Sequence, residues 1–421
     1  MNDNLYINRN IMCIDLKSFF ASCECVDRGL DPFKVPLVVA NKKQGNGAIT
    51  LAVTPYLKAQ GVPSRTRLYN IPEHIKYTIV PPRMKLYIAK SKEVIGIYLD
   101  YVSADDLHAY SIDECFLDVT TYLKLYKKTD YELAEEILTK IYQKTGLTAT
   151  CGIGPNLLLA KVAMDIEAKK YKNGIAKWTY EDIKTKLWHI SPLSKMWGIG
   201  KRMEKNLNIL NIYTIGDLAN YDKNKLKDKF GVMGLELWNH ANGIDLSKIS
   251  DYKMQAKDKS YSHSQVLFKD YNGENIRLII SEMVDLLTIR LRTNNKQTTI
   301  IGLGISYSKE IQSGFYHTLK LDAATDSNKE INKVCNIIFD RYYNDLPIRK
   351  VSICCGGLTT KKGIQLNLFD EYSNIQEEAK INETIDGIKN KYGKNSLIKA
   401  SSLLPDSTAI ERNTKIGGHH E

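Results

Sequence analysis

The sequence predicts a multidomain α+β protein, and three observations support this class. Strand-like and helical periodicities alternate from residue 11 to about 178, and they alternate again over residues 260–360. Between these regions, residues 179–246 form short helical segments separated by glycine-rich turns. A chain of 421 residues is also too long for one ordinary domain and favours two to four.

The N-terminal elements fit a ferredoxin-like sheet with an insertion at about 42–82. In chain order we expect a strand at 11–16, a helix at 18–29, a strand at 36–41, a helix at 83–101, a strand at 110–119, a helix at 129–144, a strand at 148–154 and a helix from Asn156. Residues 260–360 repeat the order β-α-β-β-α-β as a second unit. The tail from about 370 is polar and weakly specified, with partial helical character.

Composition narrows the class of partner. The net charge of +11 and the isoelectric point near 9.0 favour a polyanion such as nucleic acid. No apolar run reaches the roughly 18 residues of a membrane span, and "MNDNLYINRN" lacks a signal-peptide core. The eight cysteines form no CxxC pair, so we expect reduced thiols in a cytoplasmic protein with no membrane partner.

Three carboxylates are the main candidates for chemistry. Asp15 ends the first strand, and the adjacent Asp113 and Glu114 interrupt the apolar strand "YSIDECFLDV". The first and third strands are central neighbours in a ferredoxin-like sheet, so these acids could converge and bind Mg²⁺ or Mn²⁺. An alternative remains open, in which Asp113 and Glu114 flank a β-bulge or pair with nearby lysines. Nothing marks Asp118 as a ligand, and it is interpreted as structural.

Two segments, "CIDLKSFFASCE" (13–24) and "YSIDECFLDVT" (110–120), resemble the catalytic motifs of Y-family translesion DNA polymerases. The similarity is greatest to the UmuC-like branch, the bacterial ImpB/MucB/SamB type, and extends over roughly residues 10–370. It implies a right-hand polymerase with a ferredoxin-like palm, small fingers, a helix-hairpin-helix thumb and a β-α-β-β-α-β little finger. The implied domains are palm 1–18 and 83–178, fingers 19–82, thumb 179–246, linker 247–259, little finger 260–360, and a clamp-binding motif with a C-terminal tail, 361–421.

The resemblance also assigns the active site. It implies that Asp15, Asp113 and Glu114, with the backbone carbonyl of Leu16, hold two Mg²⁺ ions, with Mn²⁺ as the alternative metal. Asp15 and Asp113 would hold both ions, and Glu114 the ion near the primer end.

Phe19 and Phe20 are expected beside the incoming nucleotide. Neighbouring residues on a helix point about 100° apart, so one ring must be core. The resemblance makes Phe20 the steric gate that excludes a ribose 2′-hydroxyl.

The resemblance implies that Lys161, in "LLLAKVAMD", contacts the triphosphate, and Lys58 is a further expected contact. Pro55 and Lys58 occupy positions where the family has a tyrosine and an arginine. Proline offers no side-chain donor, and lysine cannot supply the bidentate fork of arginine, so this contact departs from the family pattern. Arg65 and Arg67 are either alternative phosphate contacts or merely exposed residues.

DNA and protein partners are implied by two further motifs. "WGIGKRMEKNL" resembles a helix-hairpin-helix, in which Gly198 and Gly200 let backbone N–H groups approach a phosphate while Lys201 and Arg202 supply charge. "FGVMGLELW" is a weaker second candidate. "QLNLF" fits the peptide that docks bacterial polymerases on the sliding clamp β, through Gln365, Leu366, Leu368 and Phe369.

Together these features predict a translesion DNA polymerase that adds dNTPs to a primer on template DNA, without proofreading, in damage tolerance and SOS mutagenesis. We expect a nucleoid-associated cytoplasmic enzyme that binds primer–template DNA and the sliding clamp, with a UmuD-like subunit as a further candidate partner. The rival enzyme is a structure-specific nuclease. The non-enzymatic rival is an inactive DNA-binding or clamp-binding accessory.

Overall fold

The computed structural model describes residues 5–253, 260–361, 372–417 and 419–420. The chain divides into two compact units, residues 1–254 with 419–421, and residues 255–418. In the described ranges, no helix is long and apolar enough to span a bilayer.

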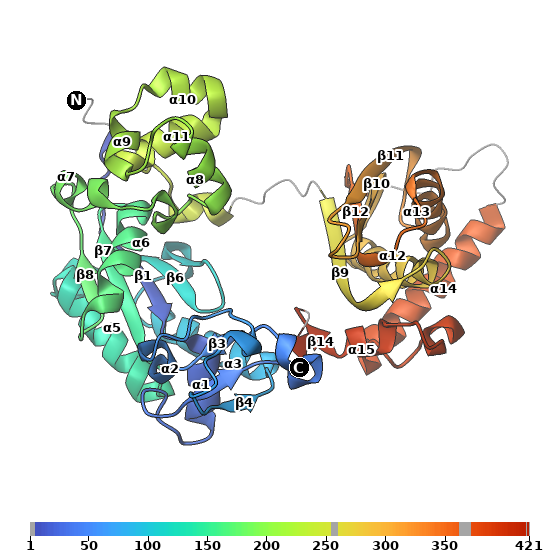
Figure 1. Cartoon of the computed structure of the whole chain (residues 1–421), viewed down its shortest axis with the longest axis horizontal. Helices are drawn as coiled ribbons and strands as arrows, with labels where there is room; N and C mark the ends of the chain where they lie inside the picture. Colours follow the sequence, from blue (N-terminus) through green and yellow to red (C-terminus); the bar gives the residue numbers. More distant parts are fainter. Residues whose placement is uncertain (1–4, 254–259, 362–371, 418, 421) are drawn as a thin grey trace. The chain divides into compact units, whose positions relative to one another are not determined.

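The first unit is built around a five-stranded sheet in the order β5-β6-β1-β7-β8 (Figure 1). The strands are β1 (Ile11–Leu16), β5 (Leu107–Ala109), β6 (Glu114–Asp118), β7 (Ala149–Gly154) and β8 (Ile175–Lys177). With the two helices that connect these strands, α3 (Met84–Leu99) and α5 (Asp130–Thr145), the order β7-β1-β6-β5 is ferredoxin-like. The prediction that the first strand neighbours the "YSIDECFLDV" strand is confirmed.

The two faces of this sheet are covered by different helices. Met12, Ile14 and Leu16 of β1 face the core formed with α3 and α5. Ile11 and Cys13 face the opposite way, toward α6 (Leu157–Ile166). Helix α6 lies very close to β7, because a side chain at Gly152 would come within 2.1 Å of the Ala160 carbonyl oxygen. The residue that follows Cys13 on this face is Asp15, so α6 covers the strand that carries the first carboxylate.

A second, three-stranded sheet has the order β3-β2-β4, with β2 (Leu37–Val39), β3 (Ala52–Val53) and β4 (Thr78–Val80). The strand expected at 36–41 is therefore present as β2, but it belongs to this small sheet and not to the ferredoxin-like sheet. Its hydrogen-bonding partners, β3 and β4, both come from the segment that we predicted to be an insertion. Helices α1 (Phe19–Asp27) and α2 (Pro55–Ala59) pack against this sheet.

Short helices follow, as the glycine-rich turns predicted. They are α7 (Asp182–Thr185), α8 (Lys201–Asn208), α9 (Ile215–Asn220), α10 (Lys223–Phe230) and α11 (Val232–Ala241), whereas the short helix α4 (Leu123–Tyr126) lies earlier, between β6 and α5. Their core includes Leu158, Leu159 and Val162 of α6. Helix α6 is therefore buried between the sheet on one side and this helical region on the other.

The second unit contains a four-stranded antiparallel sheet in the order β11-β10-β12-β9. Its main elements are β9 (Ser260–Tyr271), α12 (Asn275–Thr293), β10 (Lys296–Tyr307), β11 (Gly314–Thr325), α13 (Asn328–Tyr342) and β12 (Ile348–Gly356). The predicted β-α-β-β-α-β order is confirmed. Both helices cover the same face of this sheet (Figure 1).

The C-terminal segment is better defined than its polar sequence suggested. It contains α14 (Tyr372–Tyr392) and α15 (Ala409–Asn413), and the minor strands are β13 (Thr359–Thr360), β14 (Lys415–Ile416) and β15 (His419–His420). The Arg292 guanidinium on α12 binds Asp386 through two contacts, of 2.7 and 3.1 Å, and Arg412 reaches Glu282 at 3.4 Å. Sequence periodicity missed this docking because ion pairs, rather than an apolar stripe, carry it.

Candidate active site

Strand pairing brings two of the predicted carboxylates together. In the antiparallel ladder between β1 and β6, Asp15 lies directly opposite Glu114. On its other side Asp15 pairs with Thr150 of β7, whose hydroxyl donates to the Asp15 carbonyl at 3.3 Å. Directly paired residues project from the same face of a sheet, so both carboxylates face the side that α6 covers. The predicted convergence of Asp15 and Glu114 is therefore present in the backbone register.

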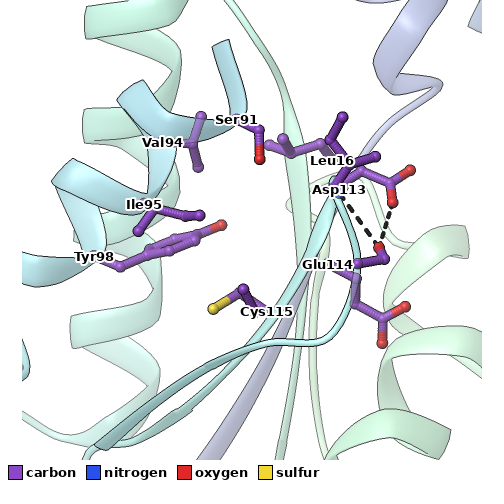
Figure 2. Close-up of a pocket in the computed structure, with 11 residues that line it drawn as sticks. Leu16, Ser91, Val94, Ile95, Tyr98, Asp113, Glu114 and Cys115 are labelled. Carbon is purple, nitrogen blue, oxygen red and sulfur yellow. Dashed lines mark hydrogen bonds between the residues drawn. The ribbon is translucent and has the colours of Figure 1, made fainter. Parts of the chain in front are cut away.

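Asp113 stands just before β6 and is held by local contacts. Its carbonyl accepts a hydrogen bond from the Leu16 amide at 2.9 Å, which ties it to the end of β1. The Ser111 hydroxyl donates to the Asp113 carboxylate at 2.6 Å. Figure 2 shows both acidic side chains pointing away from Val94, Ile95 and Tyr98, which line a cavity of about 10 Å³, room for about one water molecule. The two carboxylates thus point away from the apolar side chains of α3.

A buried lysine holds Glu114. The Lys161 ammonium group lies 2.9 Å from each Glu114 carboxylate oxygen, and the Cys13 thiol donates to the same carboxylate at 3.2 Å. Lys161 is only 7% exposed because α6 is enclosed on both sides. The Asn156 side chain caps this helix by accepting from the Leu159 amide at 2.8 Å. The position of Lys161 is therefore fixed by a capped, buried helix.

Two functional candidates escaped the sequence reasoning, Asp165 and Lys169. One Asp165 oxygen lies 2.9 Å from Lys161, and the other lies 2.7 Å from Lys169. Lys169 in turn lies 3.1 Å from Asp15. The missed signal is the spacing Lys161–Asp165–Lys169, two consecutive i,i+4 pairs of opposite charge. A chain of alternating charges thus runs from Glu114 to Asp15.

Burial perturbs the ionisation of this cluster. Burial raises the pKa of Asp15 to about 6, and the opposing effect of Lys169 does not cancel it. Burial alone would lower the pKa of Lys161 and Lys169, but nearby acidic groups outweigh it and raise both. In the described part of the chain, no three His, Cys, Asp or Glu side chains are already grouped around a metal position. Lys161 contacts Glu114, as the lysine-pairing alternative predicted for that residue, and Lys169 contacts Asp15.

The two phenylalanines at the start of α1 have different surroundings. The Phe19 ring is 2% exposed and lies in the core, so the predicted nucleotide contact cannot come from its side chain. Phe20 is partly exposed and rests on Tyr87, with ring centroids 4.7 Å apart. Of the two, Phe20 has the ring available to a ligand.

Lys58 on α2 keeps part of its side chain exposed, and the charges of the carboxylate cluster act on its amine. Burial lowers the pKa of its amine, whereas the fields of Asp15 and Asp113 raise it. Asp15 therefore influences both Lys58 and Lys169. Its neighbour Pro55 occupies the first position of α2, where it offers no side-chain donor.

The helical region presents the glycines expected to meet phosphate. Gly198 has a φ of 90°, which favours glycine, and Gly200 is the N-cap of α8. Both glycines are exposed, as are Lys201 and Arg202. The Trp197 indole donates to the Tyr110 hydroxyl at 3.1 Å, which connects the hairpin to the segment before β6.

Comparison with known proteins decides the family. Residues 14–165 match the impB/mucB/samB family, residues 258–368 match its C-terminal domain, and residues 180–212 match the IMS family HHH motif. The chain is 41% identical to the UvrX protein of Bacillus subtilis (strain 168), named for UV-damage repair, over 98% of this chain and 97% of that protein. The chain belongs to the impB/mucB/samB family of Y-family translesion polymerases. The resemblance of "CIDLKSFFASCE" and "YSIDECFLDVT" to that family is confirmed.

Further relatives and a solved structure agree with this family. DNA polymerase IV 2 of the same Bacillus subtilis strain is 34% identical, over 98% of both chains. A solved Y-family DNA polymerase chimera of Dbh and Dpo4 has a TM-score of 0.65 at 20% identity, covering 83% of this chain and 98% of the chimera. At that identity the likeness concerns the fold, and it confirms the predicted right-hand architecture.

Two remaining sequence predictions have different outcomes in this family member. The segment Gln365–Phe369 lies outside the described residues, so its clamp-binding role stays a prediction. Asp118 lies at the far end of β6, where it accepts from the Thr120 amide at 3.1 Å and lies 3.8 Å from Arg9. These contacts agree with its interpretation as structural.

Proposed function

We propose that this Y-family DNA-directed DNA polymerase extends a primer by two-metal phosphoryl transfer at Asp15, Asp113 and Glu114. The observation that carries the proposal is the direct cross-strand pairing of Asp15 with Glu114, with Asp113 tied to the same strand end. This arrangement gathers hard oxygen ligands at one edge of a rigid sheet. A nuclease is not favoured, because the family to which the chain belongs is polymerase-like along nearly its whole length.

The donor set suits divalent cations such as Mg²⁺. Glu114 forms an ion pair with Lys161, and Asp15 forms one with Lys169, so both carboxylates already lie beside positive charge. The raised pKa of Asp15 reflects the free-energy cost of burying its charge. Asp15, Asp113 and Glu114 would hold the ions, with the Leu16 carbonyl as an additional ligand. When bound, two ions would stabilise the attacking 3′ oxygen and the departing pyrophosphate. Mn²⁺ offers the same oxygen preference.

The lysines would bind the triphosphate. Asp165 contacts Lys161 and Lys169 through separate oxygens. Asp165 would therefore still hold both ammonium groups in place when Glu114 and Asp15 bind metal ions instead of the lysines. Lys58 contributes a third positive charge near the same acids. Three ammonium groups near one site complement the charge of a nucleoside triphosphate. The departure from arginine at Lys58 implies point-charge attraction rather than bidentate binding.

Phe20 would select the sugar. Its partly exposed ring stands four positions after Leu16, at the start of the helix that follows β1. A ring packed against the sugar leaves no space for a 2′-hydroxyl, so ribonucleotides would be excluded sterically. Phe19 anchors the same helix in the core.

Partner binding would use two further motifs. Backbone N–H groups near Gly198 and Gly200, with Lys201 and Arg202, would hold phosphates without reading bases. Gln365, Leu366, Leu368 and Phe369 would dock on the sliding clamp. A UmuD-like subunit is the further partner that the UmuC-like resemblance implies.

Primer extension on a damaged template tests the central proposal. Wild type should add nucleotides with Mg²⁺, and Asp113→Asn should reduce the rate by about a thousandfold, because a metal ligand loses its charge. Degradation of the strand by wild type, without extension, would support the nuclease instead.

Deletion of Gln365–Phe369 should remove stimulation by the clamp while basal synthesis persists. Equal loss of both would contradict docking.

A further inference from the structure

An ionic network centred on a buried carboxylate lies near the Phe20 ring. Its centre is Glu24, one helical turn after Phe20 on α1 and fully buried. The Arg83 guanidinium donates to Glu24 at 2.7, 3.0 and 3.2 Å, and Arg28 also contacts the same carboxylate. The Tyr87 hydroxyl donates to Glu24 at 2.7 Å. Nothing in the proposed chemistry uses these groups, although they lie beside the ring that would select the sugar.

The network connects two elements that are far apart in the sequence. Glu24 and Asp27 belong to α1, whereas Arg83 is the N-cap of α3 and Tyr87 lies in its first turn. Arg83 binds Asp27 at 2.6 Å while it also holds Glu24, so one guanidinium spans two carboxylates. Burial alone would raise the pKa of Glu24, but hydrogen bonds from Arg83, Tyr87 and Arg28 outweigh it and lower the pKa. The carboxylate is therefore ionised and held at several points.

Tyr87 connects this network to Phe20. Its side chain is fully buried, and its ring lies 4.7 Å from the Phe20 ring at an interplanar angle of 35°. The centroid of the Phe19 ring lies 6.4 Å from that of Tyr87, so the Tyr87 ring packs against both phenylalanines. A tyrosine whose hydroxyl is fixed by a charged acceptor cannot slide along its neighbours without breaking that bond. The position of the Phe20 ring therefore depends on a hydrogen bond on the far side of Tyr87.

We propose that Glu24 and Arg83, acting through Tyr87, are positioning residues that hold the Phe20 ring in place and thereby set the discrimination between deoxyribonucleotides and ribonucleotides. This inference rests on the proposed role of Phe20 as the steric gate. In this proposal Glu24, Arg83 and Tyr87 do not touch the nucleotide. They restrict the movement of the Phe20 ring, which does contact it.

The physical reason is the short range of steric exclusion. A hydroxyl extends beyond the hydrogen that it replaces by roughly one bond length, so a displacement of about 1 Å in the excluding ring is enough to admit it. A deoxyribose has no 2′-hydroxyl, so it fits whether the Phe20 ring is in its native position or displaced. Loosening the network should therefore weaken rejection of ribonucleotides while leaving deoxyribonucleotide turnover nearly intact.

Tyr87→Phe is the sharpest test, because it removes one hydroxyl and leaves the ring and the Arg83–Glu24 contacts. Single-nucleotide incorporation would be measured for matched dNTP and rNTP on the full chain. The ratio of kcat/KM for dNTP to that for rNTP should fall about tenfold, the factor expected when a hydrogen bond to a charged group is lost. The kcat for dNTP should stay within about twofold of wild type.

A matched control lies beyond the other end of the same helix. The Tyr101 hydroxyl donates to Glu136 at 3.1 Å, and Tyr101→Phe removes an equivalent tyrosine–glutamate bond about 20 Å along α3. This variant should keep the wild-type ratio. Glu24→Gln, which keeps the size of the side chain, should change the ratio in the same direction as Tyr87→Phe.

The Phe20→Ala background separates the inference from the gate assignment. Phe20→Ala should abolish most discrimination, and adding Tyr87→Phe should cause no further loss, because both act through one ring. A wild-type ratio in Tyr87→Phe, beside a collapsed ratio in Phe20→Ala, would overturn the inference and leave the gate standing. An unchanged ratio in Phe20→Ala would overturn both. Equal losses of kcat/KM for dNTP and rNTP in Tyr87→Phe would show a merely structural role and overturn the inference.

Discussion

Lys161 and Glu114 form a buried ion pair in which one ammonium group lies 2.9 Å from both carboxylate oxygens. Each partner is at least nine-tenths buried, so each charge depends on the other for its stability. The pair joins α6 to β6, and so connects the proposed triphosphate site to the proposed metal site.

The first prediction concerns this ion pair. Lys161→Met should lower the free energy of unfolding of the metal-free chain by about 3 kcal/mol, because it leaves the Glu114 charge buried without its main partner. Urea unfolding followed by tryptophan fluorescence measures the change. The double variant with Glu114→Gln should recover much of the loss, since no unpaired charge remains. Lys90→Met, which breaks the more exposed pair with Glu93, should cost less than about 1 kcal/mol.

The second prediction concerns Ser18, which turns the chain from β1 into α1. Its φ of 49° and ψ of 42° are left-handed, a conformation that strains residues other than glycine. Ser18→Val should be less stable than Ser18→Gly by about 2 kcal/mol, because a β-branched side chain tolerates this backbone least. Urea unfolding of both variants gives the difference. Equal stability of the two variants would contradict the strain argument.

The third prediction concerns the docked C-terminal segment. Asp386→Ala should destabilise the second unit by about 3 kcal/mol, because Arg292 would lose its two-point carboxylate partner in a largely buried position. Hydrogen–deuterium exchange of α14 should rise accordingly. Asp340→Ala is the matched control, since its pair with Arg277 is largely exposed and should contribute less than about 1 kcal/mol. An unchanged exchange rate in Asp386→Ala would contradict the proposed docking.

The fourth prediction concerns His263 on β9. Burial and the charges of Arg412 and Lys394 lower the pKa of its imidazole. Below pH 6.5 the unfolded chain takes up a proton that the folded chain resists, so stability should fall as the pH decreases, by at most about 1.4 kcal/mol per pH unit. Unfolding followed by circular dichroism between pH 7.5 and 5.5 (about the range of histidine titration) measures the slope. His263→Gln should reduce the slope without abolishing it, because burial also lowers the pKa of His108 and His240. An unchanged slope would exclude His263 as a source.

Much of the catalytic arrangement could be predicted from local pattern. The apolar run around Asp113 and Glu114 identified a strand, and the adjacent acids marked the point where it meets the site. The ferredoxin-like order then predicted that Asp15 would neighbour this strand, and the register confirms it. Local periodicity was less informative for residues 36–41, because a three-residue strand does not reveal which sheet it joins.

The sequence by itself determined the family, the order of the elements and the identity of the acids, because these depend on motifs and on periodicities of two and 3.6 residues. Only the tertiary structure decided which cations face those acids and what lies behind Phe20. The pairing of Lys169 with Asp15 and of Tyr87 with Glu24 joins residues 154 and 63 positions apart. Such contacts arise from the packing of helices across a sheet, which fixes side-chain neighbours that no local pattern specifies.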